Sequence, residues 1–489
     1  MADIVLATFN ARYEHASPAL RSLKANLGGL AGRAKILEFN LETGIPEALE
    51  AVLAESPKIV GLGVYVWNAR ESLELAAELK ALRPDLALAA GGPEISHETE
   101  RQELGRLADY VVAGEGELAF AELCRGVLAG RPPARGVIKA GPPDLAGLEL
   151  PYALYTGEDI ANRVLYAEAS RGCPFGCEFC LSSLDRGVRY FPLERLFAAW
   201  DALLARGALR FKFTDRTFNA DPARASAVLE FFLARPRPGL FLHFEVMPDR
   251  LPEELLALVK KFPAGALQLE VGLQTFDPEA AARIGRRQDN AAAERNIARL
   301  LRETGAYIHA DLVAGLPGEG LESFAAGFDR LYALGPHEIQ VGLLKKLRGA
   351  PVARHDAEWG MVYSPYAPYE VRRTGALAFE EVRRLRRFAR YWDLVANSGV
   401  FAETSRLLCA GPSPFASFMA FSDRLYAATG QTHSISRARL AAFLKGFLAA
   451  EKGLPAAQAE AAMERDALRA GRSARGARRQ ARRAPAPGA

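Results

Sequence analysis

The sequence predicts an α/β protein in which two units with parallel sheets are followed by a mostly helical region. Residues 1–135 and 161–345 alternate short apolar runs with amphipathic stretches, which is the pattern of strands and helices in βαβ units. Beyond residue 345 the pattern is mostly helical. With 489 residues, of which 49% are hydrophobic, the chain can bury more than one core. We therefore expect a Rossmann- or flavodoxin-like sheet, a partial (β/α)6 TIM-like barrel and a helical domain, in that order.

The first unit, residues 1–135, contains five apolar runs that we expect to be strands of one sheet. These runs are residues 4–7, 34–38, 59–64, 86–90 and 110–113. Strands that are apolar along their whole length are typical of a parallel sheet covered by helices on both faces. Ser17 followed by Pro18 is a favourable start for the first helix.

Residues 136–160 are rich in glycine and proline and interrupt this pattern, so we expect a linker there. The second unit, residues 161–345, resumes the alternation. Its strand candidates are residues 164–169, 209–213, 240–245, 267–271, 307–313 and 338–343. These strands with intervening helices predict a partial barrel, whose ligands gather at the carboxyl ends of the strands.

The C-terminal part is expected to form a helical domain over residues 346–468 and a disordered, Arg- and Ala-rich tail over residues 469–489. The tail holds seven Arg residues and no acidic residue, so a net charge of +4 for the whole chain leaves −3 for residues 1–468. A body that is not basic argues against a nucleic-acid groove. Because neither a long apolar run nor a signal-peptide pattern occurs, we expect a cytoplasmic protein without a membrane anchor.

Three of the five cysteines, Cys173, Cys177 and Cys180, form a C-x3-C-x2-C segment directly after a strand candidate. An odd number of cysteines, with three close together, suits metal ligation better than a disulfide framework. Three thiolates leave one iron of a four-iron cluster open for another ligand. The alternative is a structural zinc, which needs a fourth ligand, and His243 is the nearest downstream candidate.

This segment resembles the signature of radical S-adenosylmethionine (SAM) enzymes, in which three cysteines hold a [4Fe–4S] cluster that cleaves SAM reductively. The resemblance places the aromatic residue before the last cysteine, Phe179, near the SAM adenine. Later strand ends carry elements similar to those of the same superfamily, and their candidate cofactor-binding residues are Asp215, Gln274, Gly315 and Pro317. Glu245, also at a strand end, is a candidate for ribose or substrate contact, or else a polar residue of the barrel rim. Arg171 is a candidate for holding the cluster region or the SAM carboxylate, or else a surface residue.

Glycine-containing turns follow three strands of the first unit, at the edge where open α/β sheets bind ligands. The candidate ligand-binding residues in these turns are Gly63, Val64, Gly91, Gly92, Gly114 and Glu115. Glycine lets a bulky ligand approach the backbone, although a tight turn alone also calls for it. A parallel α/β domain before a radical SAM barrel is similar to the cobalamin (B12)-binding radical SAM proteins, in particular to a poorly characterised subgroup with an extra helical C-terminal domain. The segment around His15 lacks the D-x-H-x-x-G pattern of a cobalt-binding histidine, so we do not expect His15 to bind cobalt.

The resemblance implies an enzyme with a [4Fe–4S] cluster, SAM and cobalamin that methylates an unactivated carbon or catalyses a radical cyclisation or rearrangement. It also implies an electron donor such as flavodoxin or ferredoxin, and a small-molecule or peptide substrate that no motif identifies. One alternative is a tRNA methylthiotransferase, whose N-terminal domain carries further cluster cysteines where this chain has only Cys124. The other is a non-enzymatic sensor that binds cobalamin and structural zinc.

Overall fold

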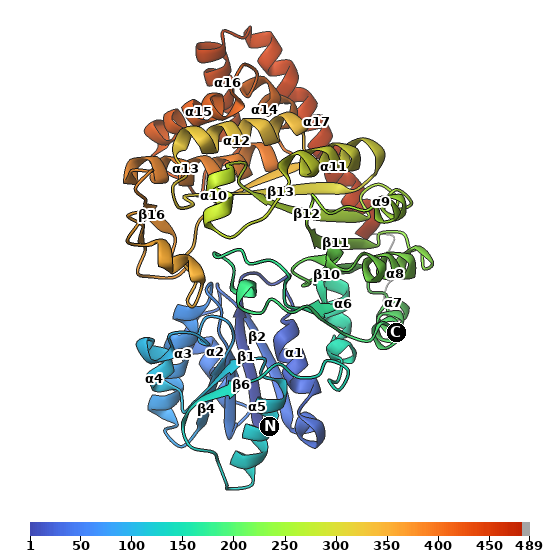
Figure 1. Ribbon diagram of the computed structural model, residues 1–489, viewed down its shortest axis with the longest axis vertical. Helices are drawn as coiled ribbons and strands as arrows, with labels where there is room; N and C mark the ends of the chain where they lie inside the picture. The colour runs from blue at the N-terminus through green and yellow to red at the C-terminus, as the bar shows by residue number, and fades with distance from the viewer. Residues whose placement is uncertain (482–489) are drawn as a thin grey trace.

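The computed structural model describes residues 1–481 and shows three parts stacked along the long axis of the molecule (Figure 1). An α/β domain lies at one end, a barrel of parallel strands in the middle, and a helical C-terminal region at the other end. The fold class predicted from the sequence is thereby confirmed.

The α/β domain contains a six-stranded parallel sheet with the strand order β2-β1-β3-β4-β5-β6. Its strands are β1 (Ile4–Asn10), β2 (Ala34–Asn40), β3 (Ile59–Gly63), β4 (Ala87–Gly91), β5 (Tyr110–Gly114) and β6 (Gly136–Ala140). One face is covered by α2 (Ile45–Leu53), α3 (Ala69–Leu82) and α4 (Glu103–Leu107), and the other by α1 (Pro18–Ala25) and α5 (Glu117–Leu128). The strand order reverses between β1 and β3, which is where open α/β sheets bind ligands.

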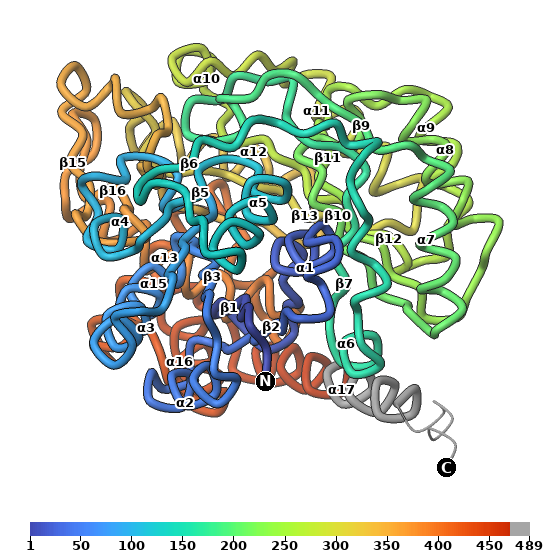
Figure 2. Tube along the Cα trace, turned by 90° about the horizontal axis from the view of Figure 1, so that it is seen from below, coloured from blue at the N-terminus to red at the C-terminus, as the bar shows by residue number. Residues whose placement is uncertain are grey.

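The segment predicted as a linker, residues 136–160, is largely built into the fold. β6 pairs in parallel with β5, so the sheet extends past the domain boundary expected at residue 135. The next helix, α6 (Gly157–Asn162), lies beside α1 in both views (Figures 1 and 2). Buried Arg21 of α1 joins this helix to the sheet, with ion pairs of 2.9 Å to Asp159 and 2.8 Å to Glu38. Packed structure therefore connects the α/β domain to the barrel.

The barrel is an open sheet whose strands pair in parallel in chain order. They are β7 (Leu165–Ala167), β10 (Arg210–Phe213), β11 (Phe241–Val246), β12 (Leu267–Gln274), β13 (Tyr307–Ala314) and β14 (Glu338–Leu343). The surrounding helices are α7 (Leu193–Ala205), α8 (Pro222–Leu233), α9 (Glu253–Val259), α10 (Pro278–Arg283), α11 (Asn290–Glu303) and α12 (Leu321–Leu334). Along β12 buried and half-buried residues alternate, so Leu and Val pack under the helices while polar residues face the concave side. Within residues 1–481, β7 and β14 do not pair with each other, so the barrel stays open on one side.

The C-terminal region begins with a short hairpin of β15 (Val362–Tyr363) and β16 (Val371–Arg373). The helices that follow are α13 (Phe379–Trp392), α14 (Ala402–Leu408), α15 (Pro414–Thr429), α16 (Arg437–Lys452) and α17 (Ala456–Ala481). The hairpin and α14 were not expected, because elements this short leave little periodicity in a sequence. The tail predicted to be disordered from residue 469 is helical as far as Ala481, and residues 482–489 lie outside the described part of the chain.

The segment between the barrel and this hairpin reaches back to the α/β domain. Arg348 Nε donates a hydrogen bond of 3.0 Å to Glu94 Oε1, and Arg348 Nη1 donates one of 3.2 Å to Glu98 Oε2. The Tyr369 hydroxyl also donates to Glu94, whose carboxylate is buried. The C-terminal region is thereby tied to the turn that follows β4.

Candidate functional site

The three cysteines line a cavity of about 260 Å³ at the carboxyl ends of the barrel strands, which we call the cysteine cavity. Of the other residues predicted at this site, Phe179, Glu245 and Gln274 also line it. The structure adds polar and sulfur-containing residues that were not among these candidates: Thr217, Arg216, Met247, Glu270, Arg286 and Asp311. Side chains from successive strand ends thus converge on one mouth of the barrel, as the fold predicts.

The loop that carries the cysteines is held in place by a residue outside the cavity. Asp215, after the end of β10, accepts hydrogen bonds of 2.9 Å from the Ala169 backbone amide and 2.6 Å from the Ser170 hydroxyl. Burial raises the pKa of Asp215 to about 6. Asp215 therefore anchors the chain just before the cysteines instead of lining the cavity, and a contact between it and SAM stays a prediction.

The three thiols suit a cluster better than a single ion. Cys173, Cys177 and Cys180 all line the same cavity, yet among residues 1–469, whose side chains the structure describes, no three His, Cys, Asp or Glu side chains converge closely enough to hold one metal ion. A structural zinc requires such convergence from four ligands, whereas an iron–sulfur cubane spreads its ligands around a wider body. His243, the candidate fourth zinc ligand, is bonded to Glu270 Oε2 at 2.8 Å. The donor set therefore fits a [4Fe–4S] cluster with three protein ligands.

Arg286 is a candidate functional residue that sequence reasoning missed. Its buried guanidinium donates to Cys177 Sγ at 3.4 Å and to Met247 Sδ at 3.5 Å, and it also bonds the Gly272 carbonyl oxygen. Burial raises the pKa of Cys177, and Arg286 opposes that effect by favouring the thiolate, which is the form that binds metal. In the sequence Arg286 is one of two adjacent arginines, so no spacing distinguishes it from Arg287.

The concave side of the barrel carries carboxylates in contrasting environments. Although burial opposes it, the hydrogen bond with His243 and the charge of Lys212 lower the pKa of Glu270 to about 2. Glu245 has only a long ion pair, 3.7 Å to Arg216, and burial raises its pKa to about 7. The site therefore holds one firmly ionised carboxylate and one that can exchange a proton near neutral pH.

A buried histidine extends this polar lining toward the other end of the strands. His309 Nε2 lies 3.0 Å from Asp311 Oδ1, and its Nδ1 lies 3.4 Å from Glu338 Oε2. Although burial opposes it, the two carboxylates raise the pKa of His309 to about 10. The imidazole is consequently a buried cation at neutral pH.

Gly315 and Pro317 do not line the cysteine cavity. A Cβ on Gly315 would lie 2.7 Å from Val371 Cγ1 of β16, so glycine is required there for the hairpin to pack against the barrel. The Pro317 carbonyl oxygen accepts a hydrogen bond of 3.4 Å from Arg283 Nη1 of α10. Both residues thus hold neighbouring elements against the end of β13, and their contact with SAM stays a prediction.

A second cavity of about 490 Å³, which we call the glycine cavity, lies between the strand ends of the α/β domain and the barrel. Five of the residues predicted to bind a ligand there line it: Gly63, Gly91, Gly92, Gly114 and Glu115. Much of the remaining lining is apolar and includes Leu20, Leu23, Leu62 and Phe120. Val64 is buried in the core of the domain and does not line the cavity.

The turn after β4 needs glycine for its own geometry as well. Gly92 has φ +116°, and a Cβ there would lie 2.4 Å from the Val64 carbonyl oxygen. His15 does not line the glycine cavity, and its Nδ1 lies 2.8 Å from the hydroxyl of Tyr166, which does. The turn residues therefore shape the cavity wall, and the histidine lies behind it.

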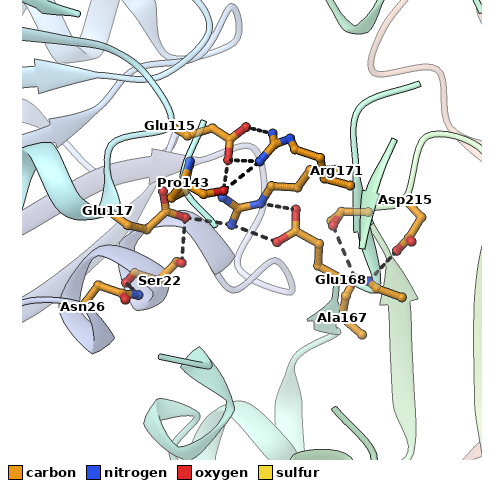
Figure 3. Close-up of polar contacts among 12 residues, drawn as sticks. Ser22, Asn26, Glu115, Glu117, Pro143, Ala167, Glu168, Arg171 and Asp215 are labelled. Carbon is orange, nitrogen blue, oxygen red and sulfur yellow. Dashed lines mark hydrogen bonds and ion pairs between the residues drawn. The ribbon is translucent and has the colours of Figure 1, made fainter. Parts of the chain in front are cut away.

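Arg171 is only 14% exposed and is therefore not a surface residue, while a contact between it and the SAM carboxylate stays a prediction. Its guanidinium lines the glycine cavity, and it binds carboxylates of both the α/β domain and the barrel (Figure 3). It is two positions from Cys173 in the chain, yet its partners are Glu115, Glu117 and Glu168.

Three family models match the chain in succession. Residues 4–124 match the B12 binding domain, residues 168–331 match the Radical SAM superfamily, and residues 357–477 match a protein of unknown function (DUF4080). These segments correspond to the α/β domain, the barrel and the C-terminal region. The chain thus contains a radical SAM domain, and the cysteine site lies within it. More particularly, the chain combines a B12-binding domain, a radical SAM domain and a DUF4080 region.

Two curated relatives match more than half of this chain. The chain is 26% identical over 331 residues to the cobalamin-dependent radical SAM methyltransferase TokK of Streptomyces tokunonensis, an alignment that covers 60% of this chain and 48% of that protein. It is 25% identical over 328 residues to 2-(S-pantetheinyl)-carbapenam-3-carboxylate methyltransferase of Streptantibioticus cattleyicolor, again covering 60% of this chain and 48% of the relative. The chain therefore spans about half the length of these relatives.

A solved structure shares the fold. The methyltransferase TsrM of Kitasatospora setae, with tryptophan and the SAM analogue aza-SAM bound, superposes with a TM-score of 0.60 at 22% identity, over 73% of this chain and 76% of TsrM. A second TsrM structure contains cobalamin and a [4Fe–4S] cluster and also gives a TM-score of 0.60. At 22% identity this likeness shows a shared fold and nothing further.

Two further observations bear on the alternatives. Cys124 is completely buried in the core of the α/β domain, where burial raises its pKa to about 12, so it does not provide an N-terminal cluster ligand of the methylthiotransferase kind. In the described part of the chain, no helix combines the length and apolar character needed to span a bilayer.

Proposed function

We propose that this protein is a cobalamin-dependent radical SAM methyltransferase. The observation that carries the proposal is that its two cavities abut. Leu181 lines the glycine cavity and directly follows Cys180, which lines the cysteine cavity. Likewise Thr214 and Thr217, from one segment after β10, line the two cavities respectively. Ligands in the two cavities would therefore be neighbours.

The residues fit the cofactors that the two domains imply. A [4Fe–4S] cluster supplies an electron for SAM cleavage, and cobalamin supplies a carrier for a methyl group. Cys173, Cys177 and Cys180 would hold the cluster, with Arg286 favouring the thiolate of Cys177. The apolar walls and backbone turns of the glycine cavity would hold cobalamin and exclude water from it.

Three residues of the cysteine cavity would hold SAM. Phe179 provides an apolar surface for the adenine, while Gln274 and Glu245 provide polar groups at the ends of β12 and β11. Glu245, with a pKa near 7, can donate or accept a hydrogen bond at neutral pH. These roles follow from position and chemistry, since each side chain borders the same cavity as the cysteines.

Methyl transfer is favoured over a radical cyclisation or rearrangement because the two curated relatives above are named as methyltransferases. We infer that the substrate is a small molecule or a peptide and that an electron donor such as flavodoxin or ferredoxin reduces the cluster. The substrate would approach where the two cavities meet, since both ligands must reach it.

The test is anaerobic reconstitution with iron, sulfide and hydroxocobalamin, followed by addition of SAM and dithionite. We expect about four irons per chain, one bound cobalamin, and formation of S-adenosylhomocysteine, the product left when SAM donates a methyl group. Formation of 5′-deoxyadenosine without S-adenosylhomocysteine would instead indicate cyclisation or rearrangement. One zinc per chain and no iron would refute the proposal.

A further inference from the structure

The base of the cysteine loop is closed by two facing arginines. β8 (Ser170–Arg171) and β9 (Arg189–Tyr190) form an antiparallel pair in which Arg171 lies opposite Arg189. The segment between them, residues 172–188, contains all three cysteines. Side chains directly opposite each other in such a pair lie on the same face, and like charges there destabilise the pair. This closure therefore needs an anion near both guanidinium groups.

Asp185 of the loop itself pairs with Arg189 at 3.3 Å, but the α/β domain supplies the one anion that both arginines share. Arg171 Nη1 donates to Glu115 Oε2 at 2.7 Å (Figure 3), and Arg189 also pairs with the Glu115 carboxylate. Arg171 completes its contacts with Glu117 at 2.7 Å and Glu168 at 3.0 Å. Glu115 is thus shared by the two arginines that close the cysteine loop, although it belongs to another domain.

Glu115 also belongs to the wall of the glycine cavity. It lies in the turn between β5 and α5, and Gly114, Glu115, Gly116 and Glu117 all line that cavity. Glu117 is fixed from the other side by the Ser22 hydroxyl of α1 at 3.0 Å, and although burial opposes it, Arg171 holds the pKa of Glu117 below its usual value. A ligand that presses on this turn consequently acts on a residue that the cysteine loop depends on.

We propose that Glu115 is a positioning residue that couples occupancy of the glycine cavity to closure of the cysteine loop. The inference rests on the proposed function, in which the first cavity binds cobalamin and the second binds the cluster. It assigns Glu115 a different role from cofactor contact, because its carboxylate is turned to Arg171 and Arg189. By linkage, a cluster that favours the closed loop must strengthen cobalamin binding by the same factor as cobalamin strengthens cluster retention.

The experiment measures this factor directly. Hydroxocobalamin is titrated, under anaerobic conditions, into the cluster-reconstituted protein and into the same protein after its iron has been removed by chelation. We expect the wild-type dissociation constant to be about fivefold or more lower with the cluster than without it. In Glu115→Gln the two dissociation constants should agree within about twofold, because the neutral amide cannot balance two guanidinium groups.

Two further variants separate positioning from a general structural defect. Glu122→Gln, on the exposed face of the same helix α5, should retain the wild-type ratio. Glu115→Gln alone should lose iron to a chelator faster than wild type. The double variant Glu115→Gln/Arg189→Gln should return to within about twofold of the wild-type rate of iron loss, because removing one guanidinium removes the repulsion. A misfolded loop would not be rescued by a second substitution.

The possible results divide cleanly. A Glu115→Gln ratio equal to that of the wild type, or a double variant that loses iron as fast as Glu115→Gln, overturns the coupling and leaves the proposed function intact. A wild-type protein that holds its iron but binds no hydroxocobalamin overturns the proposed function and this inference with it.

Discussion

The α/β domain and the barrel each contain a six-stranded parallel sheet with a cavity at the carboxyl ends of its strands, but the side chains facing those cavities differ. In the α/β domain the inner strands are buried on both sides, as in β1, where all seven residues are buried. In the barrel they alternate, as in β12, where every second residue is only half-buried. The larger cavity is therefore lined mainly by glycines and apolar side chains, with charged residues on part of its wall, and the smaller one by cysteines, arginines and carboxylates.

This difference shows that the alternation of strands and helices determines where a ligand binds, namely at the carboxyl ends of the strands. The side chains that face the cavity determine which chemical groups can bind there. A sheet covered on both faces offers a ligand backbone and apolar surface at its edge. The barrel sheet is curved, and side chains do not completely fill its concave side. A ligand there meets the polar residues of that side. Four predictions test this contrast, beginning with the largest effect.

The cysteine cavity should lose its ability to hold a cluster when one thiolate is removed. Cys177→Ala leaves two ligands for the cluster, so we expect no stable cluster and no 5′-deoxyadenosine after addition of SAM and dithionite. Iron and sulfide analysis with product chromatography measures this, and hydroxocobalamin binding reports whether the α/β domain stays intact. Cys409→Ala, which removes a buried thiol in the C-terminal region, serves as the control and should keep its iron. Iron retained at the wild-type level in Cys177→Ala would contradict the assignment.

The glycine cavity should bind cobalamin much more weakly when a large side chain fills part of it. Ala19 of α1 lines it, and Ala19→Trp would place an indole where the ligand lies. We expect hydroxocobalamin affinity to fall at least about 100-fold, because a close-packed wall cannot retreat to make room, while the iron content stays unchanged. Equilibrium titration gives the affinity, and Ala81→Trp on an exposed face of α3 is the matched control. Unaltered affinity in Ala19→Trp would place cobalamin elsewhere.

The polar interior of the barrel should make stability depend on pH. His309 has a pKa of about 10 in the folded protein against an ordinary value of 6.5, so the folded state holds one proton more between these pH values. Its contribution is complete below pH 6.5 and is lost as the pH rises toward 10, with a slope of at most about 1.4 kcal/mol per pH unit. Denaturant unfolding at pH 7 to 9.5 should show a shallower decline in His309→Gln than in wild type. Equal slopes would show that His309 is not a buried cation.

The smallest effect is expected where the C-terminal region ties the α/β domain to the barrel. Arg348→Gln leaves the buried Glu94 with only the Tyr369 hydroxyl, at a cost of about 1–2 kcal/mol in the free energy of unfolding. Glu98→Gln removes an exposed partner of the same arginine and should cost less than about 0.5 kcal/mol. Urea unfolding of both variants measures the two losses in free energy of unfolding. Equal losses would show that the burial of Glu94 does not increase the cost of removing its partner.

The barrel strands were predictable because each contains a local run of apolar residues, and the predicted ranges agree with the observed strands within a few residues. β6 was missed because its five residues lie between prolines and glycines, and only its pairing with β5 makes it a strand. The cysteine loop was predictable because its spacing is local. Arg286 and Asp215 could not be placed in the same way, since their roles depend on contacts with Cys177 and Ala169, far from them in the chain.

The position of β6 has a practical consequence for dissecting the protein. A fragment that ends at residue 135 would leave β5 with an unpaired row of backbone amides and carbonyls, because β6 supplies its partners. Such open edges recruit strands from other molecules, so the fragment would self-associate. A fragment that continues through α6 to residue 162 keeps both the edge strand and the Arg21–Asp159 ion pair. We therefore expect the fragment 1–162 to remain monomeric, unlike the fragment 1–135.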